Sequence, residues 1–466
     1  MTGNGGGSVR EEAAAATAEV NAALQRFVAE PGPSGSDLDK AQRRRIIEAA
    51  TKLINAVKDP ADEWFDTTAQ VAELGAKRLY AEWKVYDRIP LEGSISYGEL
   101  AAAVDAEEAL IRRIGGVLTS VNFLEQVGDG SVAHTKRSRV YANDHPIGLI
   151  FGMAWDNGLV PYVHLPAYFE KYGRKEPQTL NHIPATYAYG MPEYTFYEML
   201  QHDPPRLQRF LRAMGPIEEK MPIAGIYDFG WVVEYAEAHP SSDRPLFVDV
   251  GAGRGQSIKA IHRENPGLPL RRCVLQDRPE VVEAVEKLDD EDMRLVQKQA
   301  MDFHKEQPVK GALTYWIRRC LHNYGDEISV NMLRIIAEAM AGDSRLLIQE
   351  DVAANPPHWT TTMLDFMMLT FGGKHRTLEL WTDLLGRAGL KIISVSMGKG
   401  PWRHLAVIEC VRADGTAASS PPVCPEGREA DPGRTVWVSG SGRKGAGLPG
   451  HPQQPFPRFS KDGSWD

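Results

Sequence analysis

Phe247-Val248-Asp249-Val250-Gly251-Ala252-Gly253-Arg254-Gly255 is the stretch that decides the fold of this 466-residue chain. An apolar strand runs into a glycine-rich turn, and residues 256–264 have the pattern of a helix. Glycines in such a turn let the backbone approach a ligand without a Cβ in the way. The stretch therefore predicts a nucleotide-type binding site in which Gly251, Gly253 and Gly255 lie against the ligand.

The acid in this stretch indicates the charge of the ligand. A dinucleotide motif that starts at Gly251 would need its third glycine where this chain has Gln256, and Asp249 at the strand end would repel a pyrophosphate. S-adenosylmethionine instead carries a sulfonium and an ammonium group and no phosphate. A second strand ends at Asp277, 22 residues after Gly255, where an acid can accept hydrogen bonds from both ribose hydroxyls. We therefore predict S-adenosylmethionine as the cofactor, with an NAD site as the alternative.

Around this motif, short runs rich in Val, Ile and Leu alternate with helical segments, as parallel strands joined by crossover helices require. The predicted strands are 246–250, 272–276, 312–317, 345–348, 392–395 and 405–410. The fold class is thus α/β, with a doubly wound, Rossmann-like domain. The predicted divisions are a flexible segment at 1–39, a winged-helix domain at 40–145, a helical, substrate-lining linker at 146–240, the Rossmann-like domain at 241–412 and a disordered tail at 413–466. The tail has 9 Gly, 8 Pro and 6 Ser in 54 positions, too little apolar material to offset the entropy of ordering.

The pattern from 97 to 138 is typical of a winged helix: two short helices followed by a hairpin. Ser96 and Asp105 are candidate N-caps of the two helices, and Asp129-Gly130 suits a two-residue hairpin turn. One face of the second helix is predicted to carry Leu110, Ile114, Val117 and Leu118, and an earlier helical stripe that needs a partner carries Ile46, Ile47, Ala50, Leu53, Ile54 and Val57. Such a domain either binds DNA, helped by Arg43-Arg44-Arg45, or packs against another subunit.

Composition favours the second of these. The chain has 53 Lys+Arg against 62 Asp+Glu, a net charge of -9, so it has no global positive field to gather phosphates, and no nucleic-acid partner is expected. Four scattered cysteines give neither a disulfide framework nor a zinc-ligand spacing. No apolar run is long enough to cross a bilayer, so we expect a cytoplasmic protein without a membrane partner.

At this point the sequence resembles the small-molecule O-methyltransferases of plant and fungal secondary metabolism, over about residues 40 to 411. The resemblance rests on residues 249–255, Leu275-Gln276-Asp277-Arg278-Pro279, Met301-Asp302-Phe303, Arg318-Arg319-Cys320-Leu321-His322-Asn323-Tyr324 and Gly372-Gly373-Lys374. It implies S-adenosylmethionine without a metal, and a homodimer in which the winged-helix domain makes the subunit contact. It also implies that Asp302 and Phe303 bracket the adenine and that Arg318 is a basic contact of the cofactor.

His322 is the candidate general base. It follows the strand 312–317, and open α/β sheets place their active sites at the carboxyl ends of strands. A phenol is mostly protonated at neutral pH, so an imidazole within hydrogen-bond reach would accelerate its methylation about 10² to 10⁴-fold. Glu350 matches the acid that orients this histidine in the resembled family. The chain departs from the family at His322-Asn323-Tyr324, usually His-Asp-Trp, and at His375, usually an acid, while Glu379 is expected to be a solvated helix residue.

The substrate wall is predicted from flexible and aromatic side chains. Met363 and Met367, with Phe366 and Leu369, lie on an expected helix before Gly372, and Met side chains suit planar aromatic ligands. Further candidates in the aromatic linker are Met153, Trp155, His164, Tyr168 and Phe169. Core packing is the alternative role for each of them.

The sequence thus predicts an S-adenosylmethionine-dependent O-methyltransferase that acts on a hydroxyl, expected to be phenolic, of a secondary metabolite. The first alternative is a family member that binds the cofactor but catalyses a non-methylating reaction such as a pericyclic cyclisation. His322 argues against it, whereas Asn323 and His375 leave room for it. The second alternative is a winged-helix regulator, which the acidic balance disfavours. The acceptor and the position methylated are left open.

Overall fold

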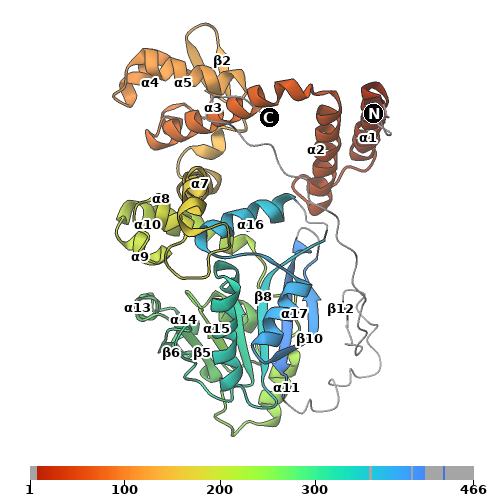
Figure 1. The fold of residues 1–466 in the computed structure, drawn as a ribbon, viewed down its shortest axis with the longest axis vertical. Helices are drawn as coiled ribbons and strands as arrows, with labels where there is room; N and C mark the ends of the chain where they lie inside the picture. The colour runs from red at the N-terminus through yellow and green to blue at the C-terminus, as the bar shows by residue number, and fades with distance from the viewer. Residues whose placement is uncertain (1–7, 356–358, 400–401, 415–433, 436–466) are drawn as a thin grey trace.

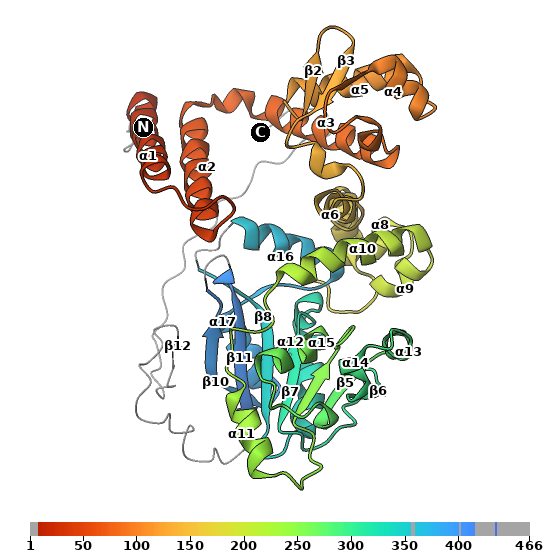
Figure 2. The ribbon, with the colours of Figure 1, turned by 180° about the vertical axis from the view of Figure 1, so that it is seen from behind.

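The computed structural model describes residues 8–355, 359–399, 402–414 and 434–435. The chain runs from an N-terminal helical part, through a middle layer of helices, to a large α/β domain (Figure 1). Seen from behind, the strands of the α/β domain end beneath the middle helices (Figure 2). Of the predicted tail, 413–466, all but residues 413–414 and 434–435 lie outside the described residues.

The α/β domain is built on one mixed sheet with the strand order β12-β10-β11-β8-β7-β4-β5-β6, and β9 pairs with the end of β8. Pairing is parallel from β8 through β7, β4 and β5 to β6, and antiparallel at β10, β11 and β12. The strands are β4 Phe247–Val250, β5 Cys273–Asp277, β6 Gln297–Ala300, β7 Thr314–Arg318, β8 Arg345–Ala353, β9 Arg376–Thr377, β10 Leu390–Met397, β11 Leu405–Arg412 and β12 Arg434–Thr435. All six predicted strands are confirmed.

Helices cover both faces of this sheet because its strands alternate apolar residues to the two sides. Val248, for example, joins the core under α15 and α17, whereas Phe247 joins the core under α11 and α12. The helices of the domain are α11 Gly230–Ala238, α12 Gln256–Glu264, α13 Pro279–Lys287, α14 Glu291–Arg294, α15 Asp326–Ala339, α16 Trp359–Phe371 and α17 Leu378–Arg387, with the short turns η5 Leu270–Arg272 and η6 Leu321–Asn323. The doubly wound, Rossmann-like class is confirmed.

The winged-helix pattern is present, with differences of detail. It contains α3 Glu63–Glu82, α4 Tyr97–Ala103, α5 Glu108–Ser120 and the sheet of β1 Ser94–Ser96, β3 Ser131–His134 and β2 Leu124–Val127, with the turns η1 Pro60–Asp62, η2 Tyr86–Arg88 and η3 Arg139–Tyr141. Ser96 caps α4 through a capping box with Glu99, as predicted.

Three details of this domain were wrong. Asp105 is not an N-cap, because α5 begins after Glu107 and Asp105 turns the chain at φ 51°. The hairpin turn has three residues, 128–130, with Gly128 at φ 58°, rather than two. Leu110 is 42% exposed, and its neighbour Ile111 takes the buried position.

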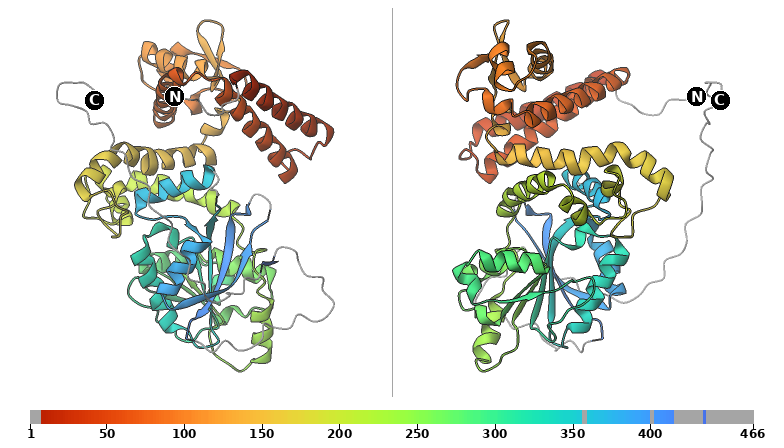
Figure 3. Two further views of the ribbon diagram at one scale, coloured as in Figure 1. Left: turned by 45° about the vertical axis from the view of Figure 1, so that its right-hand side comes forward. Right: turned by 90° about the vertical axis from the view of Figure 1, so that its left-hand side faces the viewer.

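The N-terminal residues are helical, so the prediction of a flexible segment over 1–39 was wrong for its described part. Helices α1 Val9–Ala29 and α2 Asp37–Val57 pack side by side and, with α3, form an arm beside the rest of the molecule (Figure 3). Ser8 caps α1 in a capping box with Glu11. The buried positions between the two helices include Ala16 and Ala49, so the predicted stripe was only partly right, since Ile47 is 65% exposed.

The middle layer joins the two ends of the molecule. It consists of α6 Pro146–Ala154, the π-helical turn η4 Trp155–Leu159, α7 Val160–Tyr172, α8 Pro184–Ala188, α9 Phe196–Gln201 and α10 Pro204–Lys220. Asp156 in η4 is buried and pairs with Arg78 of α3 and Arg209 of α10, each at 3.0 Å. This ion cluster ties the N-terminal domain to the middle layer. None of the helices within the described ranges is long and apolar enough to span a membrane.

Candidate active site

The glycine turn after β4 has the backbone that its sequence requires. Gly251, Gly253 and Gly255 have φ values of 72°, 56° and 76°, a region that side chains with a Cβ rarely adopt. Space is also short, since a Cβ on Gly251 would lie 2.9 Å from the Cys320 sulfur and 3.3 Å from the Phe303 ring. The turn is therefore fixed in shape and brings its backbone up to the start of α12.

Asp249 lies at the end of β4, directly before the turn, and is 1% exposed. Its Oδ2 atom is buried and accepts no hydrogen bond from the described residues. Burial raises the pKa of Asp249 to about 7, partly offset by the positive charge of Arg318 at the end of β7. A buried carboxylate oxygen without a donor is costly, so this atom is suited to a cationic group of a ligand.

The neighbouring strand ends complete the cleft. Asp277, at the end of β5, accepts hydrogen bonds from the backbone N–H groups of Gly253 and Arg278, both at 2.8 Å, and burial raises its pKa. Asp302 follows β6, where its Oδ1 accepts from the His304 N–H at 3.0 Å, and Phe303 lies beside Gly251. The structure thus gathers the predicted cofactor residues at the carboxyl ends of adjacent strands. Their chemistry fits S-adenosylmethionine, and the roles of Asp277 at the ribose and of Asp302 and Phe303 at the adenine stay predictions.

His322 lies in η6, the turn that follows β7, and its side chain is 8% exposed. The Nδ1 atom lies 2.6 Å from Oε2 of Glu350 on β8. The other oxygen of Glu350 accepts the backbone N–H of Leu321 at 2.9 Å and that of His322 at 3.4 Å. One carboxylate therefore holds both the ring and the backbone of His322, and the ring keeps Nε2 available to accept a proton.

The segment that ends in β9 clamps this turn. The Lys374 N–H donates to the His322 carbonyl at 2.9 Å, and a Cβ on Gly373 would lie 2.0 Å from the same carbonyl oxygen. Arg376, fully buried, donates to the carbonyls of Leu321 at 3.1 Å and Tyr324 at 2.9 Å. Glycine at 373 is required by this close approach.

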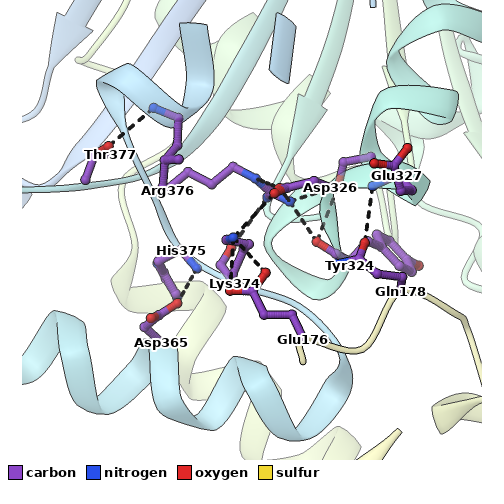
Figure 4. Close-up of polar contacts among 12 residues, drawn as sticks. Glu176, Gln178, Tyr324, Asp326, Glu327, Asp365, Lys374, His375, Arg376 and Thr377 are labelled. Atoms are coloured by element: carbon purple, nitrogen blue, oxygen red, sulfur yellow. Dashed lines mark hydrogen bonds and ion pairs between the residues drawn. The ribbon is translucent and has the colours of Figure 1, made fainter. Parts of the chain in front are cut away.

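Ion pairs extend the clamp to the middle layer and to α15. Figure 4 shows Lys374 between Glu176 and Asp326, at 2.9 and 3.3 Å, with Arg376 reaching the same Asp326. The loop before α8, the turn that carries His322 and the segment before β9 are therefore linked by hydrogen bonds and ion pairs.

A second histidine lies beside the first. The rings of His322 and His375 are parallel within 8° with their centroids 5.6 Å apart. His375 Nδ1 lies 3.6 Å from Oδ2 of Asp351, and the partly buried His404 lies 3.5 Å from the other oxygen of Asp351. From the sequence, His375 was only a departure from the family pattern, and Asp351 and His404 were not predicted to lie at the site. Glu379 is exposed, as expected.

The substrate-wall candidates are spread over two layers. Helix α16 contacts η6, so Met367, half-buried, and Met363, 51% exposed, lie on the helix next to His322. Met153 is buried in α6, and the Trp155 ring lies near Phe151 with Arg78 of α3 over it, on the side of the N-terminal domain. His164 places its Nδ1 2.9 Å from the Val160 carbonyl of its own helix. A role for these five residues in binding the acceptor stays a prediction.

Comparisons with known proteins decide the family. The family described as "O-methyltransferase domain" matches residues 170–391. Methyltransferase cfoD of Aspergillus candidus is 41% identical over 382 residues, which is 80% of this chain and 93% of that protein. This chain belongs to the S-adenosylmethionine-dependent O-methyltransferases of secondary metabolism.

Solved structures share the fold. OxaC, in complex with S-adenosylhomocysteine and oxaline, has a TM-score of 0.75 at 22% identity and covers 87% of this chain and all of its own. A structure described as a pericyclic reaction enzyme has a TM-score of 0.67 at 20% identity and covers 86% of this chain. The prediction of an S-adenosylmethionine-dependent methyltransferase is confirmed. Among the residues that the structure describes, no three His, Cys, Asp or Glu side chains are grouped so as to hold a metal ion.

Proposed function

We propose that this methyltransferase acts on a hydroxyl group, expected to be phenolic, of a small secondary metabolite, with His322 as the general base. The observation that carries the proposal is the buried His322–Glu350 pair at 2.6 Å, next to the glycine turn. When bound, S-adenosylmethionine supplies a methyl group on a positively charged sulfur. The sulfur–methyl bond breaks as the oxygen–methyl bond forms, which leaves neutral S-adenosylhomocysteine.

The residues of the chain have two tasks in this reaction. His322 accepts the hydroxyl proton at Nε2, so that the oxygen carries negative charge as it attacks, and Glu350 stabilises the imidazolium through its Nδ1–H. Glu350 suits this role because its pKa is lowered: burial raises it, but the neighbouring His322, Arg319 and His375 together outweigh burial. The clamp by Gly373 and Arg376 keeps Nε2 in place, which supports in-line alignment of the reacting atoms.

The pericyclic alternative is the weaker one. The likeness to the pericyclic reaction enzyme, at 20% identity, concerns the fold. A base oriented by a buried carboxylate has a use when a proton must leave the acceptor, and a cyclisation without proton removal has no use for it. The regulator alternative lacks support in the charge of the chain, since the net charge is -9.

We also propose that the protein is a homodimer whose contact includes the N-terminal arm. Apolar side chains that are 55% to 65% exposed lie along α2 and α3, namely Ile47, Ile54, Val57, Trp64, Phe65 and Val71. A row of this kind is unusual on a free monomer. Light scattering after gel filtration should give twice the chain mass, and Trp64→Glu with Phe65→Glu should give the monomer.

The proposed reaction is tested by incubating the protein with methyl-labelled S-adenosylmethionine and a metabolite extract from the native host. We expect label in a product that loses it on O-demethylation, and no such product with His322→Ala. Label on nitrogen or carbon, or an undiminished yield from His322→Ala, would contradict the proposal. A cyclised product without label would favour the pericyclic alternative.

A further inference from the structure

A second imidazole–carboxylate pair, which the reaction described above leaves unused, lies beside His322. His375 and Asp351 are both buried, with side chains 5% and 3% exposed. Asp351 directly follows Glu350 on β8, so two successive residues of one strand each face a histidine. The second pair therefore repeats the arrangement of the first at the same strand end.

The second pair is incomplete within the described residues. His375 Nδ1 and Asp351 Oδ1 are buried without a hydrogen-bond partner. The 3.6 Å between His375 Nδ1 and Asp351 Oδ2 is slightly too long for a hydrogen bond, as is the 3.5 Å between Asp351 Oδ1 and His404. Buried polar atoms in this condition destabilise the folded protein. A small shift of His375 toward Oδ2 of Asp351 would give Nδ1 a hydrogen-bond partner, and a ligand that binds the other side of the ring would favour this shift.

The backbone of His375 is already fixed. Its N–H donates to Asp365 of α16 at 2.6 Å, and Lys374 before it belongs to the clamp on His322 (Figure 4). The position of the ring relative to His322 is therefore set by the same segment that sets the base. Burial lowers the pKa of His375, and the nearby His322 lowers it further, so His375 is neutral at neutral pH.

We propose that His375, backed by Asp351, binds a second hydroxyl of the acceptor beside the one that His322 deprotonates. With Nδ1–H toward Asp351, Nε2 of the neutral ring can accept a hydrogen bond, so the group that it recognises is a hydrogen-bond donor such as a hydroxyl. The rings are parallel and 5.6 Å apart. Each ring turns Nδ1 toward an acid of β8, so both Nε2 atoms face away from that strand. Oxygens hydrogen-bonded there at about 2.8 Å lie roughly as far apart as the rings. Hydroxyls in a 1,3 relation on an aromatic ring, with oxygens about 4.8 Å apart, suit this arrangement because both can point to one side of the arene, whereas 1,4-hydroxyls, about 5.5 Å apart, point to opposite sides.

The inference rests on the proposed function and gives its substrate class: 1,3-dihydroxylated arenes of the resorcinol type. His375 would then determine specificity, because an acceptor with a single hydroxyl leaves its Nε2 without a partner. Neighbouring groups would have supporting roles: Asp351 sets the tautomer of His375, and His404 links Asp351 to the surface.

Phenol and resorcinol are suitable probes because they differ by one hydroxyl group. The protein is labelled with ¹³C at histidine Cε1, saturated with S-adenosylhomocysteine, and titrated with each probe by NMR. The His322→Gln and His375→Phe variants assign the two signals. His239→Gln, an exposed histidine at the end of α11, is the control variant. We expect phenol to shift the His322 signal alone and resorcinol to shift both signals.

The variants add a second measurement. His375→Phe keeps an aromatic ring but loses both nitrogens, so resorcinol should bind about five-fold or more weakly while phenol binding stays within two-fold. An unshifted His375 signal, or equal resorcinol affinity in wild type and His375→Phe, overturns the inference and leaves the base assignment intact. If neither probe shifts His322, the acceptor site of the proposed function is overturned together with this inference.

Discussion

Replacing Asp249 by Asn should stabilise the protein without cofactor and weaken the binding of the cofactor. The carboxyl is buried, with one oxygen lacking a donor within the described residues, and its pKa rises to about 7. The folded state therefore holds a proton that the unfolded chain releases near the ordinary pKa of 3.8. Because the folded state binds more protons between these two values, stability falls as the pH rises from about 4 to about 7.

The size of the effect follows from the two pKa values. The raised pKa costs the folded protein about 1.7 kcal/mol at pH 5 and on the order of 4 kcal/mol at pH 8. Asn keeps the shape and has no charge, so the stability gain of Asp249→Asn should grow by roughly 2.5 kcal/mol between these pH values. Loss of the carboxylate should remove about 1.5 to 3 kcal/mol of binding to the ammonium, or roughly 10- to 150-fold in affinity.

Urea unfolding of wild type and variant at pH 5 and pH 8, without cofactor, measures the first quantity, and calorimetric titration with S-adenosylmethionine measures the second. In wild type, cofactor affinity should rise up to tenfold per pH unit below pH 7 and level off above it. Asp292→Asn, an exposed acid on α14, is the control. A variant that is less stable than wild type at pH 8, or that binds the cofactor equally well, would refute the reasoning.

Four further predictions concern the base, its clamp and the absence of a metal. His322→Ala should lower turnover about 100-fold or more with nearly unchanged cofactor affinity, as measured by initial rates and calorimetry. In Glu350→Gln, the amide oxygen still accepts the Leu321 N–H, and the amide NH₂ group faces Nδ1 of His322. The imidazole proton therefore moves to Nε2, and turnover should fall by about 10² to 10⁴-fold. ¹⁵N NMR should show the changed tautomer of His322, and an unchanged tautomer would contradict this prediction. Gly373→Ala should lower both Tm and turnover, since its Cβ would lie 2.0 Å from the His322 carbonyl oxygen, and a Tm equal to wild type counts against the clamp. EDTA should leave the rate unchanged, and inhibition that magnesium reverses would assign the enzyme to a metal-dependent class.

Much of the fold could be predicted because local patterns and long-range packing agree there. The strand from Phe247 to Val250 is buried on both faces, as a strand between two helical layers must be, and the glycines that follow it suit a turn with positive φ values. Strand β6 was missed because its sequence, Gln297 to Ala300, is mostly polar, which an edge strand tolerates. Helix α1 was missed over most of its length because its Ala-rich sequence has little amphipathic pattern and is stabilised by α2.

The site was predictable residue by residue, but its pairings were not. The structure brings Glu350 to His322 as expected, because His322 follows β7 and Glu350 lies on the neighbouring parallel strand β8. It also brings Asp351 to His375, a contact between β8 and the segment before β9 that no spacing in the sequence reveals. Side chains of successive strand residues point to opposite faces, so the sequence gives no reason to expect Glu350 and Asp351 to serve adjacent histidines.

One short loop joins Arg318, the predicted cofactor contact, to His322, the proposed base. Arg318 ends β7 beside Asp249, and His322 follows four residues later. Between them Arg319 adopts φ 52°, an unfavourable conformation for a residue with a side chain, and its N–H is held by the Gln349 carbonyl at 3.1 Å. The loop is therefore held in a strained shape at both ends, by β8 and by the Gly373 clamp. Any change that relaxes the clamp should also displace Arg318 from its place beside Asp249. Gly373→Ala should therefore weaken cofactor binding and lower turnover. His322→Ala leaves the backbone in place and should lower turnover alone.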